Sequence, residues 1–322
     1  MAYYLENSFS IRMLSVGTHH NNAPGQGTLI RQPATAQLLI DSLDRFTAGY
    51  PNSLAEAQSL SSSNWSLNLQ QVVMNGYVTR LGVSQILFHW NLRTVVGGYS
   101  DAFSVSYDGG AAVQVALVTG WYNVETMAAM LQAQLNLAVV GAAFVVQWDA
   151  LRGVFSVDAG AGHTVVFQPP ADNRERRTQH MLGLLAAQPA AQIQRGVPPT
   201  MLPTRYVDIC STYLTKYQRL KDANTLQSNI TSTCIARLFA IPLNSSEYIR
   251  AGTALADASS PGDAPFVITV DYTFPKQIAW NPEEGISNFD IQLFDEDGEL
   301  IPYNPAAGIM CEYNMVLLAS ED

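Results

Sequence analysis

The stretch SDAFSVSYDGGAAVQVALV, residues 100–118, decides the fold class. Apolar side chains alternate with small or polar ones before the turn, at Phe103, Val105 and Tyr107, and the alternation returns after it. Asp-Gly-Gly between two such runs is typical of a β-hairpin, because these residues accept the positive φ angles that tight hairpin turns need. The sequence therefore predicts an antiparallel hairpin here.

Further alternating or β-rich runs lie on both sides of this hairpin. Strands are predicted at 66–74, 84–92, 142–168 (a three-stranded meander), 205–213, 231–241, 266–274, 286–294 and 312–318. One helix is predicted from a cap at Asn123 to near Gly141, and a shorter one at 174–187 with Gly183 inside it. Because strands do not alternate with long helices, the sequence predicts an all-β fold: a single jelly-roll antiparallel sandwich with two or three short helices.

The N-terminal part of the sequence has a different character. Residues 19–36 are rich in turn formers and show no sustained period, which predicts an extended arm or exposed loop. A short helix is predicted from Ala36 to Phe46, followed by a linker at 51–64. The predicted organisation is an N-terminal arm and linker at 1–64 and a jelly-roll domain with insertions at 65–322.

Composition excludes several classes of protein. Hydrophobic residues make up 48% of the chain and charged residues only 14%, which favours a globular protein with a weakly charged surface. The 17 Lys and Arg against 27 Asp and Glu leave no large basic surface, so direct binding to nucleic acid is disfavoured. The sequence has no predicted transmembrane segment, and we expect a soluble protein made in a reducing compartment.

The motifs of common enzymes are missing from the sequence. It has no P-loop, no dinucleotide-binding glycine motif, no nucleophile elbow and no Cys-x-x-Cys. The five histidines are scattered, without the local spacing of metal ligands. We therefore predict no enzymatic activity, no catalytic residues, no cofactor-binding residues, no metal ligands and no cofactor. Cys210, Cys234 and Cys311 are predicted to be buried thiols.

Two charged clusters each have two interpretations. The run Asp295–Glu299 could be a calcium loop, or a β-turn with a glycine at positive φ and solvated charges; the sequence favours the turn. The run Arg174–Arg177 could contact an acidic neighbour or genome, but a solvated first turn of a helix is favoured.

Three segments of the chain match, in order, the motifs of one protein family. Gly120-Trp121-Tyr122-Asn123-Val124, with its helix ending in Leu135-Asn136, resembles a G-x-Y-x-V segment and helix. Leu182-Gly183-Leu184 is similar to a Leu-Gly-aromatic helix, with Leu184 in place of the aromatic residue. The run 289–298, followed by 312–318, resembles a C-terminal strand with an Asp-Glu-x-Gly turn and a closing strand. Over residues 65–320 the chain thus resembles penton and other minor capsid proteins of virophages, polinton-like viruses and related large DNA viruses.

The resemblance implies a structural capsid protein of an icosahedral virion. It implies a single jelly roll that forms a homopentamer (a penton) at the fivefold vertices, beside a double-jelly-roll major capsid protein and other minor capsid proteins. The location would be the capsid vertex, after synthesis in the host cytoplasm or nucleus. We expect pentamer contacts on the sandwich flanks, anchoring by residues 1–60, and exposure of loops such as 244–264.

Two alternatives to the penton stay open. One is a minor capsid cement protein between capsomers. The other is a carbohydrate-binding jelly-roll module, in which Trp121 and Trp148 would stack on sugars. An enzyme on the same fold ranks below both.

Overall fold

Two antiparallel sheets pack face to face in the larger part of the molecule. The computed structural model describes residues 35–46, 49–68, 78–186, 188–218, 233–240 and 266–320. The first sheet has the order β1-β15-β3-β12, with β1 (Thr35–Asp41), β15 (Glu312–Ser320), β3 (Arg80–Trp90) and β12 (Phe266–Asp271); the short β13 (Ile278–Ala279) also pairs with β3. The second has the order β11-β10-β14-β2, with β11 (Cys234–Phe239), β10 (Tyr206–Cys210), β14 (Asn288–Phe294) and β2 (Asn64–Asn68).

The order in which the chain visits the two sheets is that of a jelly roll. Counting β1, β2, β3, β10, β11, β12, β14 and β15 as strands B to I, the sheets read B-I-D-G and C-H-E-F. Eight antiparallel strands in this order form two Greek keys. The predicted all-β, single jelly-roll sandwich is therefore confirmed.

Alternation of side chains places the core between the sheets. In β15 every second residue, including Tyr313, Met315 and Leu317, is fully buried. Tyr313 stacks on Phe88 of β3 with ring centroids 6.0 Å apart, and its hydroxyl accepts a hydrogen bond of 2.6 Å from Trp65 Nε1 of β2. This bond satisfies the buried indole N–H and links the two sheets through the core.

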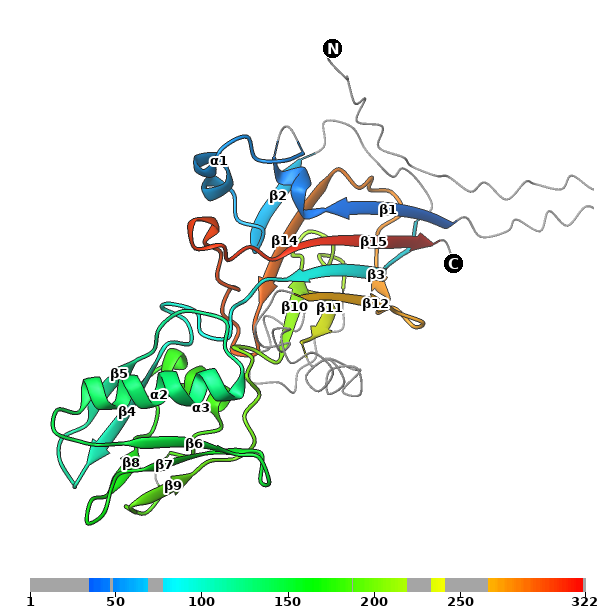
Figure 1. The fold of residues 1–322 in the computed structure, drawn as a ribbon. Helices are drawn as coiled ribbons and strands as arrows, with labels where there is room; N and C mark the ends of the chain where they lie inside the picture. Colours follow the sequence, from blue (N-terminus) through cyan, green and yellow to red (C-terminus); the bar gives the residue numbers. More distant parts are fainter. Residues whose placement is uncertain are drawn as a thin grey trace, which may run out of the picture.

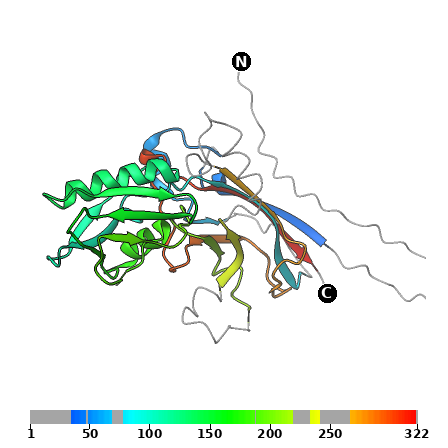
Figure 2. The same cartoon turned by 60° about the horizontal axis from the view of Figure 1, so that its bottom comes forward.

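A second unit, which we call the insert, lies between β3 and β10 (Figures 1 and 2). It contains two three-stranded sheets: β5 (Val113–Ala116), β4 (Ala102–Tyr107) and β8 (Val165–Phe167); and β6 (Val145–Asp149), β7 (Val154–Asp158) and β9 (Ile193–Arg195). The helices α2 (Val124–Ala138) and α3 (Asn173–Leu182) pack with these sheets around a separate hydrophobic core. In chain order the insert occupies the D–E connection of the jelly roll.

The hairpin and the first long helix form where the sequence predicts them. Strands β4 and β5 pair around a turn in which Asp108 and Gly109 have φ of 49° and 69°, and Gly110 N donates to Tyr107 O at 2.9 Å. Positive φ at both central residues matches the twist of a hairpin. Asn123 caps α2, since its side chain accepts a hydrogen bond from Thr126 N at 2.8 Å.

The prediction for the start of the described chain was wrong. Residues 35–41, assigned partly to a helix, form β1, which pairs along its whole length with β15. Only a 3-10 turn (Ser42–Arg45) follows, and the predicted linker at 51–64 contains the short helix α1 (Leu54–Ser59). The boundary between 64 and 65 remains a prediction, although β1, on its N-terminal side, belongs to the sandwich.

Two predictions in the insert were also wrong. The three strands within 142–168 do not form a meander, because β8 leaves β7 and pairs with β4, while β9 takes the place beside β7. Gly183 does not lie inside α3; it ends the helix at a φ of 67°. Glycine adopts this left-handed conformation without a Cβ penalty, which explains the end of the helix at this residue.

Candidate functional site

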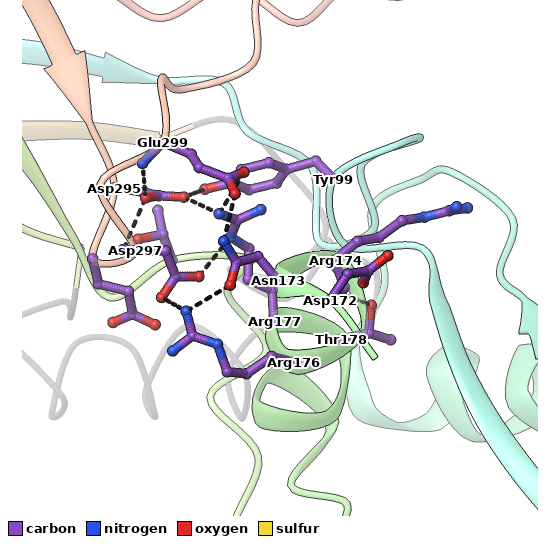
Figure 3. A network of polar contacts seen from close by, with 12 residues as sticks. Tyr99, Asp172, Asn173, Arg174, Arg176, Arg177, Thr178, Asp295, Asp297 and Glu299 are labelled. Atoms are coloured by element: carbon purple, nitrogen blue, oxygen red, sulfur yellow. Dashed lines mark hydrogen bonds and ion pairs between the residues drawn. The ribbon is translucent and has the colours of Figure 1, made fainter. Parts of the chain in front are cut away.

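The insert and the sandwich are joined by a buried cluster of charged residues, which we call the arginine clamp (Figure 3). It comprises Arg177 of α3, Tyr99, and three carboxylates from the loop after β14: Asp295, Asp297 and Glu299. The Arg177 guanidinium forms ion pairs with all three carboxylates, at 2.8 Å, 3.0 Å and 2.8 Å respectively. It also lies over the Tyr99 ring, with Cζ 4.1 Å from the centroid. One side chain from the insert thus contacts three of the four carboxylates of the sandwich loop.

Local backbone structure holds both halves of the arginine clamp. The Asp172 side chain caps α3 by accepting from Glu175 N at 2.8 Å, which fixes the first turn of the helix. On the sandwich side, Asp295 Oδ1 accepts from the backbone N of Asp297 and of Glu299, at 2.9 Å and 2.8 Å. Gly298 permits this tight loop with a φ of 78°.

The electrostatics of the arginine clamp depend on burial. The side chains of Arg177, Asp295 and Asp297 are 2%, 0% and 4% exposed. Burial raises the pKa of Asp295, an effect opposed by hydrogen bonds from Tyr99 and the backbone and by the charge of Arg177. Burial and the nearby Asp295 carboxylate raise the pKa of Tyr99, so its hydroxyl keeps its proton and donates to Asp295 at 2.6 Å. Buried charges are tolerated here because each is paired.

Further polar contacts surround the arginine clamp at the surface. Arg176 pairs with Asp297, and Asn173 Nδ2 donates to Glu299 at 2.5 Å. Arg205, just before β10, pairs with Glu296 at 2.6 Å. The hydrogen bond from Asn173 lowers the pKa of Glu299. The acidic loop is therefore contacted by α3 and, through Arg205, by the chain just before β10.

Both favoured interpretations of the charged clusters were wrong in one respect. The loop at 295–299 is a turn with a glycine at positive φ, as predicted, but its charges are held by arginines and are not all solvated. Residue Arg177 is buried, and so is Glu175 at 1% exposure, so this turn of α3 is not a solvated one. In the part of the chain that the structure describes, no group of three or more His, Cys, Asp or Glu residues could hold a metal ion. The opposite charges of the two runs were the signal that sequence reasoning missed.

The motifs behind the family resemblance have definite structural roles. Gly120 exchanges two backbone hydrogen bonds with Val95, of 3.0 Å and 3.1 Å, next to α2. Asn136, near the end of α2, hydrogen-bonds to the backbone N and O of Phe144, at 2.7 Å and 3.1 Å. A Cβ on Gly183 would lie 2.0 Å from Val197 O, so the chain approaches the end of α3 too closely for any side chain there. The motifs therefore build the insert or, at 295–299, join it to the sandwich.

The outer face of the first sheet forms the second candidate surface, which we call the flank. Its side chains alternate with the core residues, and a diagonal set of them is apolar: Leu39, Leu87, Val267, Val316 and Leu318. Leu39 on β1 is 61% exposed and Val267 on β12 is 52% exposed, and these strands are the two ends of this sheet. Apolar residues exposed on a sheet and at its edge strands mark a surface for association.

A pocket of about 410 Å³ adjoins the flank. Val267, His89 and Glu312 belong to one row across the sheet and also line the pocket, whose other walls include Tyr50 and Trp90. Arg45 neutralises Glu312 through an ion pair of 2.6 Å. The flank therefore ends in a concave, largely apolar surface.

The remaining residues singled out in the sequence lie apart from each other. Trp121 packs against the sandwich core and Trp148 against the insert core, where its ring centroid is 5.1 Å from that of Phe155. This packing does not favour the stacking on sugars that a carbohydrate-binding module needs. His19, His20 and the loop 244–264 lie outside the described residues. None of the helices in the described ranges is long and apolar enough to cross a membrane.

Comparisons with known proteins complete the description of the chain. No protein-family model matches it, and neither does any curated protein. Among solved structures it is similar to the mavirus penton protein, with 11% sequence identity and a TM-score of 0.48, over 91% of this chain and 100% of that one. It is also similar to a chain in the structure of the Sputnik virophage, with 14% identity and a TM-score of 0.43, over 89% and 98% of the two chains.

Proposed function

We propose that this chain is a non-enzymatic capsid protein that forms a homopentamer at the fivefold vertices of an icosahedral virion. The observation that carries the proposal is the exposed apolar flank on a jelly-roll sandwich. Exposed Leu39 and Val267 give no stability to an isolated chain, whereas in a ring of copies they become buried.

The jelly roll and its motifs support the proposal from a second side. The order B-I-D-G and C-H-E-F, with the insert in the D–E connection, agrees with the single jelly roll that the family resemblance implies. Arg177, Arg176 and Arg205 together pair with every carboxylate of the densest acidic run, so these carboxylates serve to hold the insert and not a substrate. The partners would be other copies of this chain, a double-jelly-roll major capsid protein and other minor capsid proteins.

Rings closed by rotation need two different surfaces that fit each other on adjacent copies. We assign the flank, with its pocket of about 410 Å³, to one side of this contact. Burial of one leucine or valine side chain contributes about 1.5–3 kcal/mol to the contact between two copies. Because the contact is repeated around the ring, one charged residue introduced on the flank should weaken assembly strongly.

The mass of the purified full chain in solution tests the proposal. Size-exclusion chromatography with light scattering and native mass spectrometry are expected to give about five times the chain mass of 35.1 kDa. Leu39→Asp and Val267→Asp are expected to yield smaller species with an unchanged circular dichroism spectrum. Leu151→Asp is the matched control, since Leu151 is 100% exposed in the insert, away from the flank, and the pentamer should persist.

The other outcomes are equally informative. A trimer of the unmodified chain would favour the cement protein, and a monomer that binds glycans would favour the carbohydrate-binding module. A pentamer that survives both flank substitutions would contradict the assignment of the flank. Electron cryomicroscopy of purified virions, with the density of this chain located away from the vertices, would refute the vertex position.

A further inference from the structure

Two cysteines lie side by side on neighbouring strands of the second sheet. Cys210 ends β10 and Cys234 begins β11, and the two are direct partners in the antiparallel register, next to a β-bulge. Both are thiols in this structure. Directly opposite residues in an antiparallel pair have Cα atoms about 4.5–5.5 Å apart, which lies within the range that a disulfide bond spans. No large backbone movement is therefore needed to join the two sulfur atoms.

A hydrogen bond joins the two thiols. The bond between Cys210 and Cys234, together with burial, raises the pKa of Cys210. The same bond lowers the pKa of Cys234, with help from the positive charges of Lys276 and Arg237. Cys234 Sγ also donates to Ala236 O at 3.3 Å. The pair thus has one thiol suited to nucleophilic attack and a second thiol directly beside it.

The two cysteines also differ in their exposure to solvent. Cys210 is fully buried, whereas Cys234 is half-buried and lines a pocket of about 360 Å³ at the edge of the sandwich. Lys276 and Arg237 line this pocket as well, and Lys276 Nζ donates to Cys234 O at 2.7 Å. A small oxidant can therefore approach Cys234 through this pocket, beside the Lys276 ammonium, whereas Cys210 is fully buried.

We propose that Cys210 and Cys234 are a redox-active dithiol that closes to an intrachain disulfide when the protein meets a low-molecular-weight disulfide such as oxidised glutathione. In the first step the Cys234 thiolate attacks one sulfur of the oxidant, which forms a mixed disulfide and releases one reduced thiol. Cys210 then loses its proton and attacks Cys234 Sγ, which releases the second reduced thiol. Overall the two cysteines lose two electrons and two protons, and the oxidant gains them.

The disulfide would fasten β11, which lies at the end of its sheet, to β10 and close the chain segment 211–233 into a loop. Closing such a loop stabilises the folded state by restricting the unfolded chain. The reduced form would be the state in the cell, and the oxidised form the more stable state outside it. This inference does not depend on the oligomeric state proposed above.

Thiol counting on the native full chain tests the inference. After incubation with oxidised glutathione and quenching by alkylation, the number of thiols per chain should fall from three to one, and peptide mapping should find Cys210 linked to Cys234. The unfolding temperature should rise by about 5 °C and return on reduction. Cys311→Ser, the matched control, should keep both the link and the rise.

The two single variants separate the roles of the thiols. Cys210→Ser should stop at a glutathione adduct on Cys234, and Cys234→Ser should form neither the adduct nor the link. Retention of all three thiols in the folded unmodified chain, a link that includes Cys311, or a bond between chains would each overturn the inference. Because the mapping uses the unmodified protein, a variant that folds poorly does not decide the result.

Discussion

Replacing Arg177 by methionine removes the guanidinium from the arginine clamp and keeps most of the aliphatic stem. The carboxylates of Asp295 and Asp297, with side chains 0% and 4% exposed, would then be left without their buried cation. Removing one partner of a buried ion pair costs about 3–5 kcal/mol, because the other charge stays desolvated. Loss of the contact over the Tyr99 ring belongs to the same change, so we expect a total of about 4 kcal/mol.

Urea unfolding at pH 7 and fixed protein concentration measures this loss. We expect a lower midpoint and an earlier transition of the insert, because the arginine clamp is its buried polar link to the loop at 295–299. Arg176→Met is the matched control: Arg176 contacts the same Asp297, but its side chain is 52% exposed, and exposed pairs contribute about 1 kcal/mol or less. The reasoning is refuted if Arg177→Met costs no more than Arg176→Met, or if the variant unfolds with the unmodified midpoint.

Two further substitutions in the insert test single features. Burial would raise the pKa of Glu175, but hydrogen bonds from Ala171, Gln114 and Ser104 outweigh this effect and lower the pKa below its ordinary 4.5. The charged form therefore stabilises the fold at neutral pH, and Glu175→Gln should cost about 2 kcal/mol of unfolding free energy at pH 7. The difference in stability between the variant and the unmodified chain should shrink as the pH falls below 4.5. Urea midpoints at pH 7, 5 and 3 check this, and a stability difference that grows in acid would contradict it. Gly183→Ala should cost about 3 kcal/mol, because the residue has a positive φ and its Cβ would meet Val197 O. Gly141→Ala is the control: its φ is 87° but the space around it is open, so it should cost only about 1 kcal/mol. Equal midpoints of the two variants in thermal unfolding would show that the close approach at Gly183 is unimportant.

Local patterns in the sequence predicted the elements whose structure depends on neighbours in the chain. The hairpin at 100–118 and the start of α2 at Asn123 are of this kind, since turn conformation and capping involve only nearby residues. The jelly-roll class was also predictable, because alternating runs without long helices leave few other arrangements.

Long-range pairing explains the elements that were predicted wrongly. Leu38, Leu39, Leu43 and Phe46 have helical spacing, but Leu38 and Ile40 also alternate, and pairing with the distant β15 decides for a strand. In the insert, β8 pairs with β4 across more than fifty residues of chain, which no local pattern reveals.

The arginine clamp could be only half predicted from the sequence. Both charged runs were recognised, but a single sequence does not say that 174–177 and 295–299 meet in space. Without that contact, charges on a helix and at a turn are most often solvated. The flank shows the same limit, because Leu39 and Val267 look like ordinary members of apolar runs until the strands have been placed.

The position of the insert has a consequence for protein engineering. Because it enters from β3 and returns to β10, a foreign module grafted at these two points would leave the hydrogen bonds of both sandwich sheets unchanged. Such a graft would also remove Arg177, so the mutually repelling carboxylates of Asp295, Asp297 and Glu299 would lose the cation that pairs with them. The grafted module must therefore supply an arginine that reaches Asp295 and Asp297. Alternatively, the sandwich must carry Asp295→Asn and Asp297→Asn, which remove the charges that need a cation.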